Sequence, residues 1–87
     1  MSQPKYSEAQ ILDLIRAALD EVVPDRGDEW AIVELDRTIE ELELDSIATM
    51  EMVGSLEEKT DTTFPDEELP KVSTLRDLAT LVQKGRL

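Results

Sequence analysis

Residues 40–60 read EELELDSIATMEMVGSLEEKT, with one serine between an acidic run and a helical apolar pattern. The apolar positions follow the 3.6-residue period of a helix and are Ile47, Met50, Met52, Val53 and Leu56. The pattern predicts a helix that begins near Asp45 or Ser46 and ends at about Thr60. Gly54 lies inside it, where glycine is about 1 kcal/mol less favourable than alanine, and we interpret it as permitting a close approach by another group.

A second amphipathic helix is predicted near the start of the chain. Ser7 and Gln10 have the spacing of a capping box, in which each side chain accepts a hydrogen bond from the other residue's backbone N–H. Apolar residues then recur with a helical period until Pro24, which cannot continue a helix. The expected helix covers residues 7–23.

Two more helices are predicted after residue 60. The sequence FPDEEL (64–69) favours a short helix with Asp66 as its cap, ended by Pro70. STLRDLATLVQKG (73–85) favours a longer one, with Ser73 or Thr74 as cap and Gly85 as terminator.

A long connection follows the first helix. PDRGDEW (24–30) is rich in turn residues, and its Asp25, Asp28 and Glu29 match a calcium loop only weakly, so we expect a solvated loop. Thr38 and Glu41 can form one capped helical turn. The apolar residues expected to anchor residues 31–44 to the core are Ile32, Val33, Leu35, Ile39, Leu42 and Leu44.

These elements predict an all-α fold, a small four-helix bundle with three longer helices and one short helix. Its 87 residues form a single domain, 1–87, with a core at about 7–84 and short flexible termini. The only aromatic residues are Tyr6, Trp30 and Phe64, which predicts an aliphatic core. Its expected members are Leu12, Ile15, Leu19, Val53, Leu56, Leu75, Leu78 and Val82.

The composition argues against several classes of function. The chain has no cysteine and no histidine, which removes thiolate chemistry and the commonest general base and metal ligand, so neither a self-contained enzyme nor a metal site is expected. The net charge of −12 opposes binding to nucleic acid or to an anionic membrane and suits partners with basic patches. Residues 1–10 contain no apolar signal core, and we expect a cytoplasmic protein.

Ser46 has two interpretations from local chemistry. Serine and aspartate are both common helix N-caps, which would make the pair at 45–46 structural. A helix N-terminus also favours negative charge, so a phosphate attached to Ser46 would be tolerated there. With no histidine in the chain, Ser46 lacks the usual activating base, and a modification would need an enzyme to install it.

From about Leu35 to Val82 the chain strongly resembles the acyl carrier protein family. The resemblance rests on an Asp-Ser pair followed by an aliphatic residue, the MEMVGSLEE helix, FPDEEL and the closing VSTLRDLATLV, in the family's order and spacing. It implies that a phosphopantetheinyl transferase, with magnesium, moves 4′-phosphopantetheine from coenzyme A to Ser46. The thiol of the group would then hold acyl intermediates as thioesters for partner enzymes, while the protein itself catalyses nothing and raises the local substrate concentration.

The resemblance also implies a docking surface. Residues 40–68 contain eleven carboxylates and one base, Lys59, and in the family such a helix docks on arginine and lysine patches of enzymes that load or extend acyl chains. A monomer is expected. The expected contact residues are Asp45, Ile47, Met50, Glu51, Glu57 and Glu58.

Several positions depart from the family pattern. Glu43 replaces a common glycine, which predicts a preceding turn that does not need positive φ. Ala48 and Lys59 replace acids of the fatty-acid-synthesis members, and Gly54 replaces a larger apolar residue. A dedicated carrier in polyketide or specialised lipid biosynthesis is therefore plausible beside fatty acid biosynthesis. Two alternatives stay open: an aminoacyl or peptidyl carrier of nonribosomal synthesis, and an unmodified acidic helical adaptor.

Overall fold

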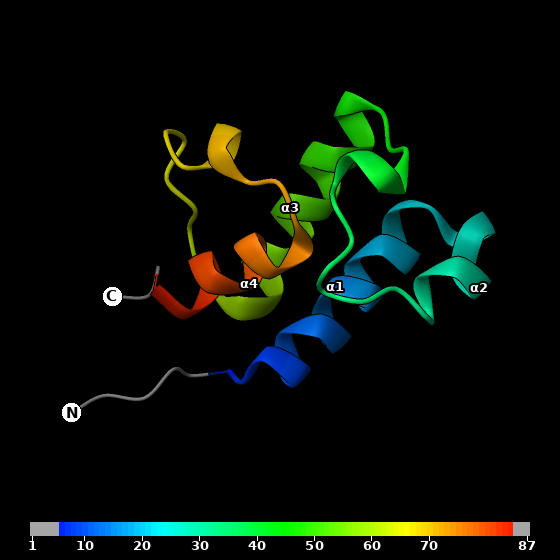
Figure 1. The fold of residues 1–87 in the computed structure, drawn as a ribbon, viewed down its shortest axis with the longest axis horizontal. Coiled ribbons are helices and arrows are strands. Elements are labelled where there is room, and N and C mark those ends of the chain that lie inside the picture. The colour runs from blue at the N-terminus through cyan, green and yellow to red at the C-terminus, as the bar shows by residue number, and fades with distance from the viewer. Residues whose placement is uncertain (1–5, 85–87) are drawn as a thin grey trace.

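Three longer helices and one short helix make up the computed structural model, which describes residues 6–84 (Figure 1). The α-helices are α1 (Glu8–Val22), α2 (Gly27–Trp30), α3 (Ser46–Thr60) and α4 (Leu75–Lys84). Single 3-10 turns are η1 (Pro24–Arg26), η2 (Glu40–Leu42) and η3 (Leu69–Lys71). Residues 6–84 contain no β-strand, only one isolated antiparallel bridge between Thr38 and Thr74. The expected all-α class is confirmed.

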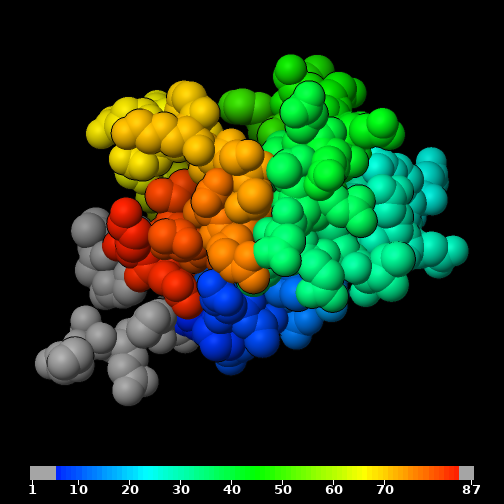
Figure 2. All heavy atoms as spheres, viewed as in Figure 1, coloured from blue at the N-terminus to red at the C-terminus, as the bar shows by residue number. Residues whose placement is uncertain are grey.

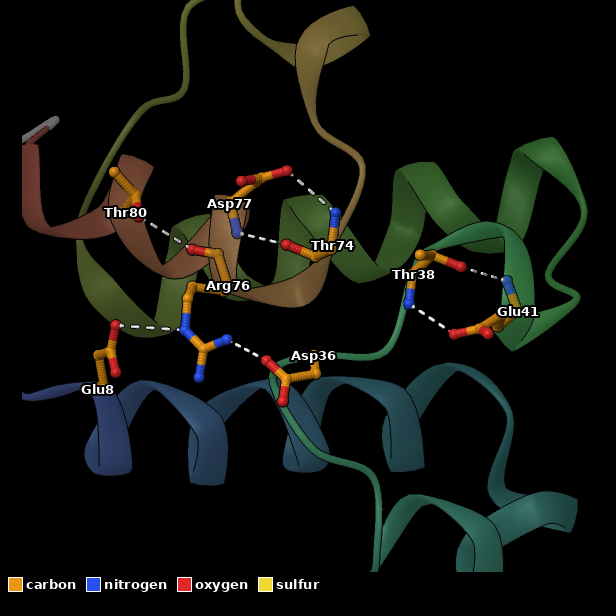
Figure 3. A network of polar contacts seen from close by, with 8 residues as sticks. All are labelled: Glu8, Asp36, Thr38, Glu41, Thr74, Arg76, Asp77 and Thr80. Carbon is orange, nitrogen blue, oxygen red and sulfur yellow. Dashed lines mark hydrogen bonds and ion pairs between the residues drawn. The ribbon is translucent and has the colours of Figure 1, made fainter.

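The starts of α1 and α4 are fixed by reciprocal caps. Ser7 Oγ accepts the N–H of Gln10 at 3.1 Å, and Gln10 Oε1 accepts the N–H of Ser7 at 2.8 Å, which confirms the capping box. At α4, Thr74 Oγ1 accepts the N–H of Asp77 at 3.2 Å. The Asp77 carboxylate in turn accepts the N–H group of Thr74 at 3.0 Å (Figure 3). It also accepts the N–H group of Ser73 at 2.9 Å. Of the two expected caps, Thr74 is the one used; Gly85 lies outside the described residues.

The short helix expected at residues 64–69 does not form. Residues 66–68 make a turn, and Pro70 lies inside η3 instead of ending a helix. Phe64 is buried and Leu69 also packs on the core. Residues five apart on a helix point about 140° away from each other, so a helix could not send both side chains inward.

The short helix of the bundle lies instead in the segment expected to be a loop. Trp30, at the end of α2, is 1% exposed, and its Nε1 donates to the carbonyl of Val23 at 2.8 Å. The Arg26 guanidinium stacks 4.3 Å from the centre of its ring. These contacts draw residues 24–30 into consecutive helical turns, and burial of one large side chain outweighs the turn-forming residues around it.

A single hydrophobic core joins the helices and the connections. Most of the expected core positions are buried, while Leu12 and Val53 are half-buried against the cluster. The core is mainly aliphatic, as expected, but Trp30 and Phe64 are also buried in it. Ile32 was also misassigned: it is 72% exposed, since the turn after Trp30 directs the next inward position to Val33.

Three arginines hold the long connection, residues 31–45, to the rest of the molecule. Arg16 of α1 donates from Nε and Nη2 to the carbonyl of Val33 at 3.0 and 2.8 Å. Arg26 Nη2 donates to the carbonyl of Leu42 at 2.7 Å. Arg76 of α4 contacts Asp36 and, through Nε, Glu8 of α1 at 3.7 Å, so it lies between the connection and α1 (Figure 3).

The middle of the connection also pairs with the start of α4 through its backbone. Ile39 N–H donates to Ser73 O at 2.8 Å, and Leu75 N–H donates to Arg37 O at 3.0 Å. The two segments form one continuous surface in the space-filling view (Figure 2). Because unpaired backbone groups are unfavourable when buried, this pairing allows the connection to lie against the core with no α-helix or strand of its own.

The last turn of the connection sets the direction in which α3 begins. Thr38 Oγ1 accepts the N–H of Glu41, and Glu41 accepts that of Thr38, which confirms the expected capped turn (Figure 3). Glu43 then has φ 56° and ψ 44°, in the left-handed region. The expectation that Glu43 avoids positive φ was wrong. The residues on either side fix this backbone conformation, because Leu42 is fully buried and Leu44 packs against the core.

Replacing Glu43 with glycine or alanine tests this strain. Both changes remove the same carboxylate, so their difference isolates the backbone. We expect the Glu43→Gly protein to be more stable than Glu43→Ala by about 1 kcal/mol, because only glycine adopts left-handed φ without a steric penalty. Urea denaturation measures the difference. Equal midpoints for the two proteins would mean that residue 43 carries no such strain.

Acid should weaken the α4 cap. Backbone hydrogen bonds from Thr74 and Ser73 lower the pKa of Asp77, so its contribution is complete above the unfolded-state pKa and is lost as pH falls through the lower folded-state value. Asp77→Asn should therefore lose about 1 kcal/mol at neutral pH and less in acid. Thermal melts across the acid range measure this. Asp28→Asn, at an exposed aspartate without a hydrogen bond in the described structure, is the control; a neutral-pH loss no larger than the control's would contradict the cap.

Candidate functional site

Ser46 is the first residue of α3, and its helix is capped by the residue before it. Asp45 has extended backbone angles, φ −73° and ψ 174°, and its Oδ1 accepts the N–H of Ala48 at 2.7 Å. The Asp45 carbonyl also accepts the hydroxyl of Thr49 at 2.9 Å. Asp45 therefore supplies the cap that the sequence allowed to either residue.

The Ser46 side chain is left exposed, and no hydrogen bond holds its hydroxyl within residues 6–84. A buried hydroxyl would have excluded any modifying enzyme. The position instead combines an accessible nucleophilic oxygen with a helix N-terminus, whose first N–H groups have no partner inside the helix. The residues present at this site fit a covalently attached phosphate ester.

An exposed stripe runs along α3 from this point. Ile47, Glu51 and Glu58 are exposed and, with the half-buried Gly54, follow the 4-3-4 spacing that places residues on one face of a helix. Ile47 is 72% exposed, and Met50, one turn from Ser46, is 70% exposed. Large apolar side chains with this exposure beside carboxylates are typical of a contact surface.

Lys59, the only base in residues 40–68, does not neutralise this stripe. Its Nζ donates to Glu21 Oε2 of α1 at 2.7 Å, and the Ser55 hydroxyl donates to the other oxygen of Glu21 at 2.8 Å. The hydrogen bond from Lys59, followed by that from Ser55, lowers the pKa of Glu21. Lys59 therefore joins α3 to α1, and the exposed stripe keeps its negative charge.

Glu57 has a different environment from the other expected contact residues. Its Oε2 accepts the N–H of Phe64 at 2.7 Å, which fixes the chain after α3 to the helix. Glu57 is half-buried and lies on a different side of α3 from Glu51 and Glu58, which are exposed and make no hydrogen bond or ion pair in the described structure. The structure thus brings Asp45, Ser46, Ile47, Met50 and Glu51 together at the start of the helix. Glu57 lies further along α3 on the cavity side that it shares with Met50, and its carboxylate is bonded to Phe64.

Beside α3 lies a cavity of about 390 Å³. The α3 residues that line it are Thr49, Met50, Val53, Gly54 and Glu57. The opposite walls include Ile39, Phe64, Leu69, Val72 and Leu78. The sequence had assigned Ile39 and Leu78 to the core. Sequence reasoning missed Phe64, Leu69 and Val72, because they lie in connections without periodicity, although the apolar residues flanking the FPDEEL turn gave a partial signal.

Gly54 does not have the role expected from the sequence. A Cβ built at Gly54 would have no neighbouring atom within 4 Å, so nothing in the described chain approaches it closely. It borders the cavity instead. Residues 6–84 also contain no group of three or more acidic side chains arranged to hold a metal ion.

The amino-acid sequence matches a known protein family. The model of the phosphopantetheine attachment site matches residues 9–82 of the chain. The chain belongs to this family. In the phosphopantetheine attachment family the prosthetic group is 4′-phosphopantetheine, held covalently.

Named relatives agree with the family assignment. An acyl carrier protein of Kocuria rhizophila is 37% identical over 76 residues, covering 85% of this chain and 94% of the relative. One from Thermobifida fusca is 29% identical over 80 residues, with 91% and 98% covered. One from Helicobacter hepaticus is 38% identical over 50 residues, with 58% and 66% covered. No solved structure gives a significant match. Within residues 6–84, no helix has the length and apolarity needed to cross a bilayer.

Proposed function

We propose that this protein is an acyl carrier protein and that Ser46 bears its 4′-phosphopantetheine. The single observation that carries the assignment of the residue is the exposed, unbonded hydroxyl of Ser46 at the start of α3, where Asp45 already provides the cap. The capping explanation for this serine is thereby removed. The family match supports the kind of group attached.

Loading is a phosphoryl transfer in which the chain supplies the nucleophile. Ser46 Oγ forms a bond to the pantetheine-side phosphorus of coenzyme A, the pyrophosphate bond breaks, and adenosine 3′,5′-bisphosphate leaves. The hydroxyl proton passes to a base of the transferase, because the chain has no histidine to accept it. Magnesium belongs to the transferase step, where it neutralises the phosphate charge.

The bound group supplies a thiol that holds an acyl chain as a thioester. The protein's own residues present that chain and catalyse nothing. The cavity beside α3 lies on the helix that begins at Ser46 and is lined mainly by apolar side chains, so we assign it to shelter the acyl chain between partners. Tethering keeps the chain at high local concentration for successive enzymes.

Docking uses the start and the exposed stripe of α3. Ile47 and Met50 provide apolar contacts, and Asp45, Glu51 and Glu58 provide the charges that meet basic patches on the transferase and on acyl-loading and synthase enzymes. We leave Glu57 out of this surface because its carboxylate is bonded to Phe64.

The pathway we propose is fatty acid, polyketide or specialised lipid biosynthesis. The protein acts as a cytoplasmic monomer, since coenzyme A and the partner enzymes must reach Ser46. An uncompensated negative surface favours rapid, salt-sensitive association with such partners and opposes self-association through that surface.

Intact-mass measurement tests the attachment site. Purified protein is incubated with coenzyme A, magnesium and a broad-specificity phosphopantetheinyl transferase. We expect the wild type to gain the mass of one phosphopantetheine and Ser46→Ala to gain none. Ser55→Ala, at the other serine of α3, should load like the wild type. An unmodified wild type under conditions that load a control carrier would contradict the proposal and favour an acidic helical adaptor.

Charge reversal tests the docking surface. Glu51→Lys and Glu58→Lys should each slow association with the transferase, by roughly tenfold at low salt, because they remove electrostatic steering without disturbing an internal contact. Stopped-flow binding at several salt concentrations measures the rate. Asp28→Lys on α2 carries the same change in net charge away from the stripe. If it slowed association equally, net charge alone would explain the effect and the stripe would have no special role.

A further inference from the structure

Gly54 is a feature of α3 that the fold itself does not require. It occupies an interior position of the helix, where glycine is unfavourable. Its φ is not positive, so its backbone conformation is open to any residue. A Cβ added at Gly54 would meet no atom within 4 Å, so no neighbouring element packs so closely that it requires a glycine here. The usual structural reasons for a glycine inside a helix are all absent in the described structure.

The location of Gly54 offers a functional reason. It lies between Ile47 and Glu58 on the exposed stripe of α3 and also borders the cavity, so it belongs to both surfaces. Met50 and Val53 line the cavity next to it. Gly54 is eight residues from Ser46, or about 12 Å along the helix axis. The exposed stripe and the cavity therefore meet at Gly54, the one residue of α3 that has no side chain.

We propose that Gly54 is a specificity-determining residue, which widens the cavity on the α3 side so that a branched or ring-bearing acyl chain can enter. The inference rests on the proposed function, because it takes the acyl chain attached through Ser46 as the occupant. A volume of about 390 Å³ lies within the range of pockets that hold small organic ligands. A thin linear chain needs less width, so a side chain at position 54 discriminates chiefly against bulky groups.

The cavity walls opposite α3 are held in place, so the width of the cavity limits which acyl chains can enter. The Phe64 side chain is buried, and its backbone N–H donates to the Glu57 carboxylate. Phe64 is therefore not free to move aside for a bulky acyl chain. Leu78 is fully buried in α4. With these sides held by the core, α3 is the side where a single residue can change the width of the opening. A leucine at position 54 would fill part of the space that a ring or branch requires.

Thioester protection provides the test. Wild type, Gly54→Ala and Gly54→Leu are each loaded from octanoyl- and phenylbutanoyl-coenzyme A, and cleavage of the thioester by hydroxylamine is followed by intact mass. We expect the wild type to protect both chains relative to the free acyl-pantetheine thioesters. Gly54→Leu should lose phenylbutanoyl protection by roughly tenfold, the effect of about two methylene groups returning to water, and should keep most octanoyl protection. Gly54→Ala should fall between them for the phenylbutanoyl chain.

The controls separate this inference from the proposed function. Ala17→Leu adds the same side chain to an exposed position of α1 and should protect both chains like the wild type. A wild type that does not load at all would overturn the proposed function. A loaded wild type that protects neither chain, or a Gly54→Leu protein that protects both as the wild type does, would overturn the role of Gly54 while the carrier assignment stands. Circular dichroism melts confirm that each variant is folded when its protection is compared.

Discussion

The structure depends on satisfying the polar backbone of residues 31–45, a connection that lies against the core and whose only helical element is the single 3-10 turn η2. Arg16 and Arg26 donate to its carbonyl groups, and Arg76 contacts its Asp36 side chain. Buried backbone groups must find partners when no helix or sheet supplies them, and a guanidinium can donate several hydrogen bonds from one rigid group. The path of this connection determines where α3 begins, and therefore where Ser46 lies.

The same contacts explain the surface charge around the candidate site. The chain has nine bases against twenty-one acids, and several of these bases are engaged between elements. Arg16, Arg26 and Arg76 hold the connection, while Lys59 pairs with Glu21 between α3 and α1. Exposed ion pairs contribute little stability individually. These contacts nevertheless hold each basic side chain against its partner element, away from the exposed stripe of α3. Glu51 and Glu58 consequently face solvent without compensation, which suits recognition by basic partners.

Three nearby residues at the start of α3 have different structural roles. Glu43 adopts a left-handed conformation, Asp45 caps the helix, and Ser46 is thereby left exposed with a free hydroxyl. Strained backbone persists where the surrounding packing fixes it, and here Leu42 and Leu44 fix both sides of the turn. The geometry of the attachment position is thus a consequence of core packing on both sides of the turn and of one aspartate side chain.

The amino-acid sequence by itself determined the long helices, the capping box of α1 and the all-α class, because periodicity and capping are local properties that residues a few positions apart express directly. For α3 and α4 it narrowed each cap to two neighbouring residues, and the structure uses Asp45 and Thr74. It also singled out Ser46 and the acidic character of α3. Only the tertiary structure decided that Trp30 forms a short helix, that residues 64–69 do not, and that Glu57 anchors Phe64 instead of facing solvent. Each of these outcomes depends on contacts between distant segments, whose burial outweighs the local preferences from which a sequence is interpreted.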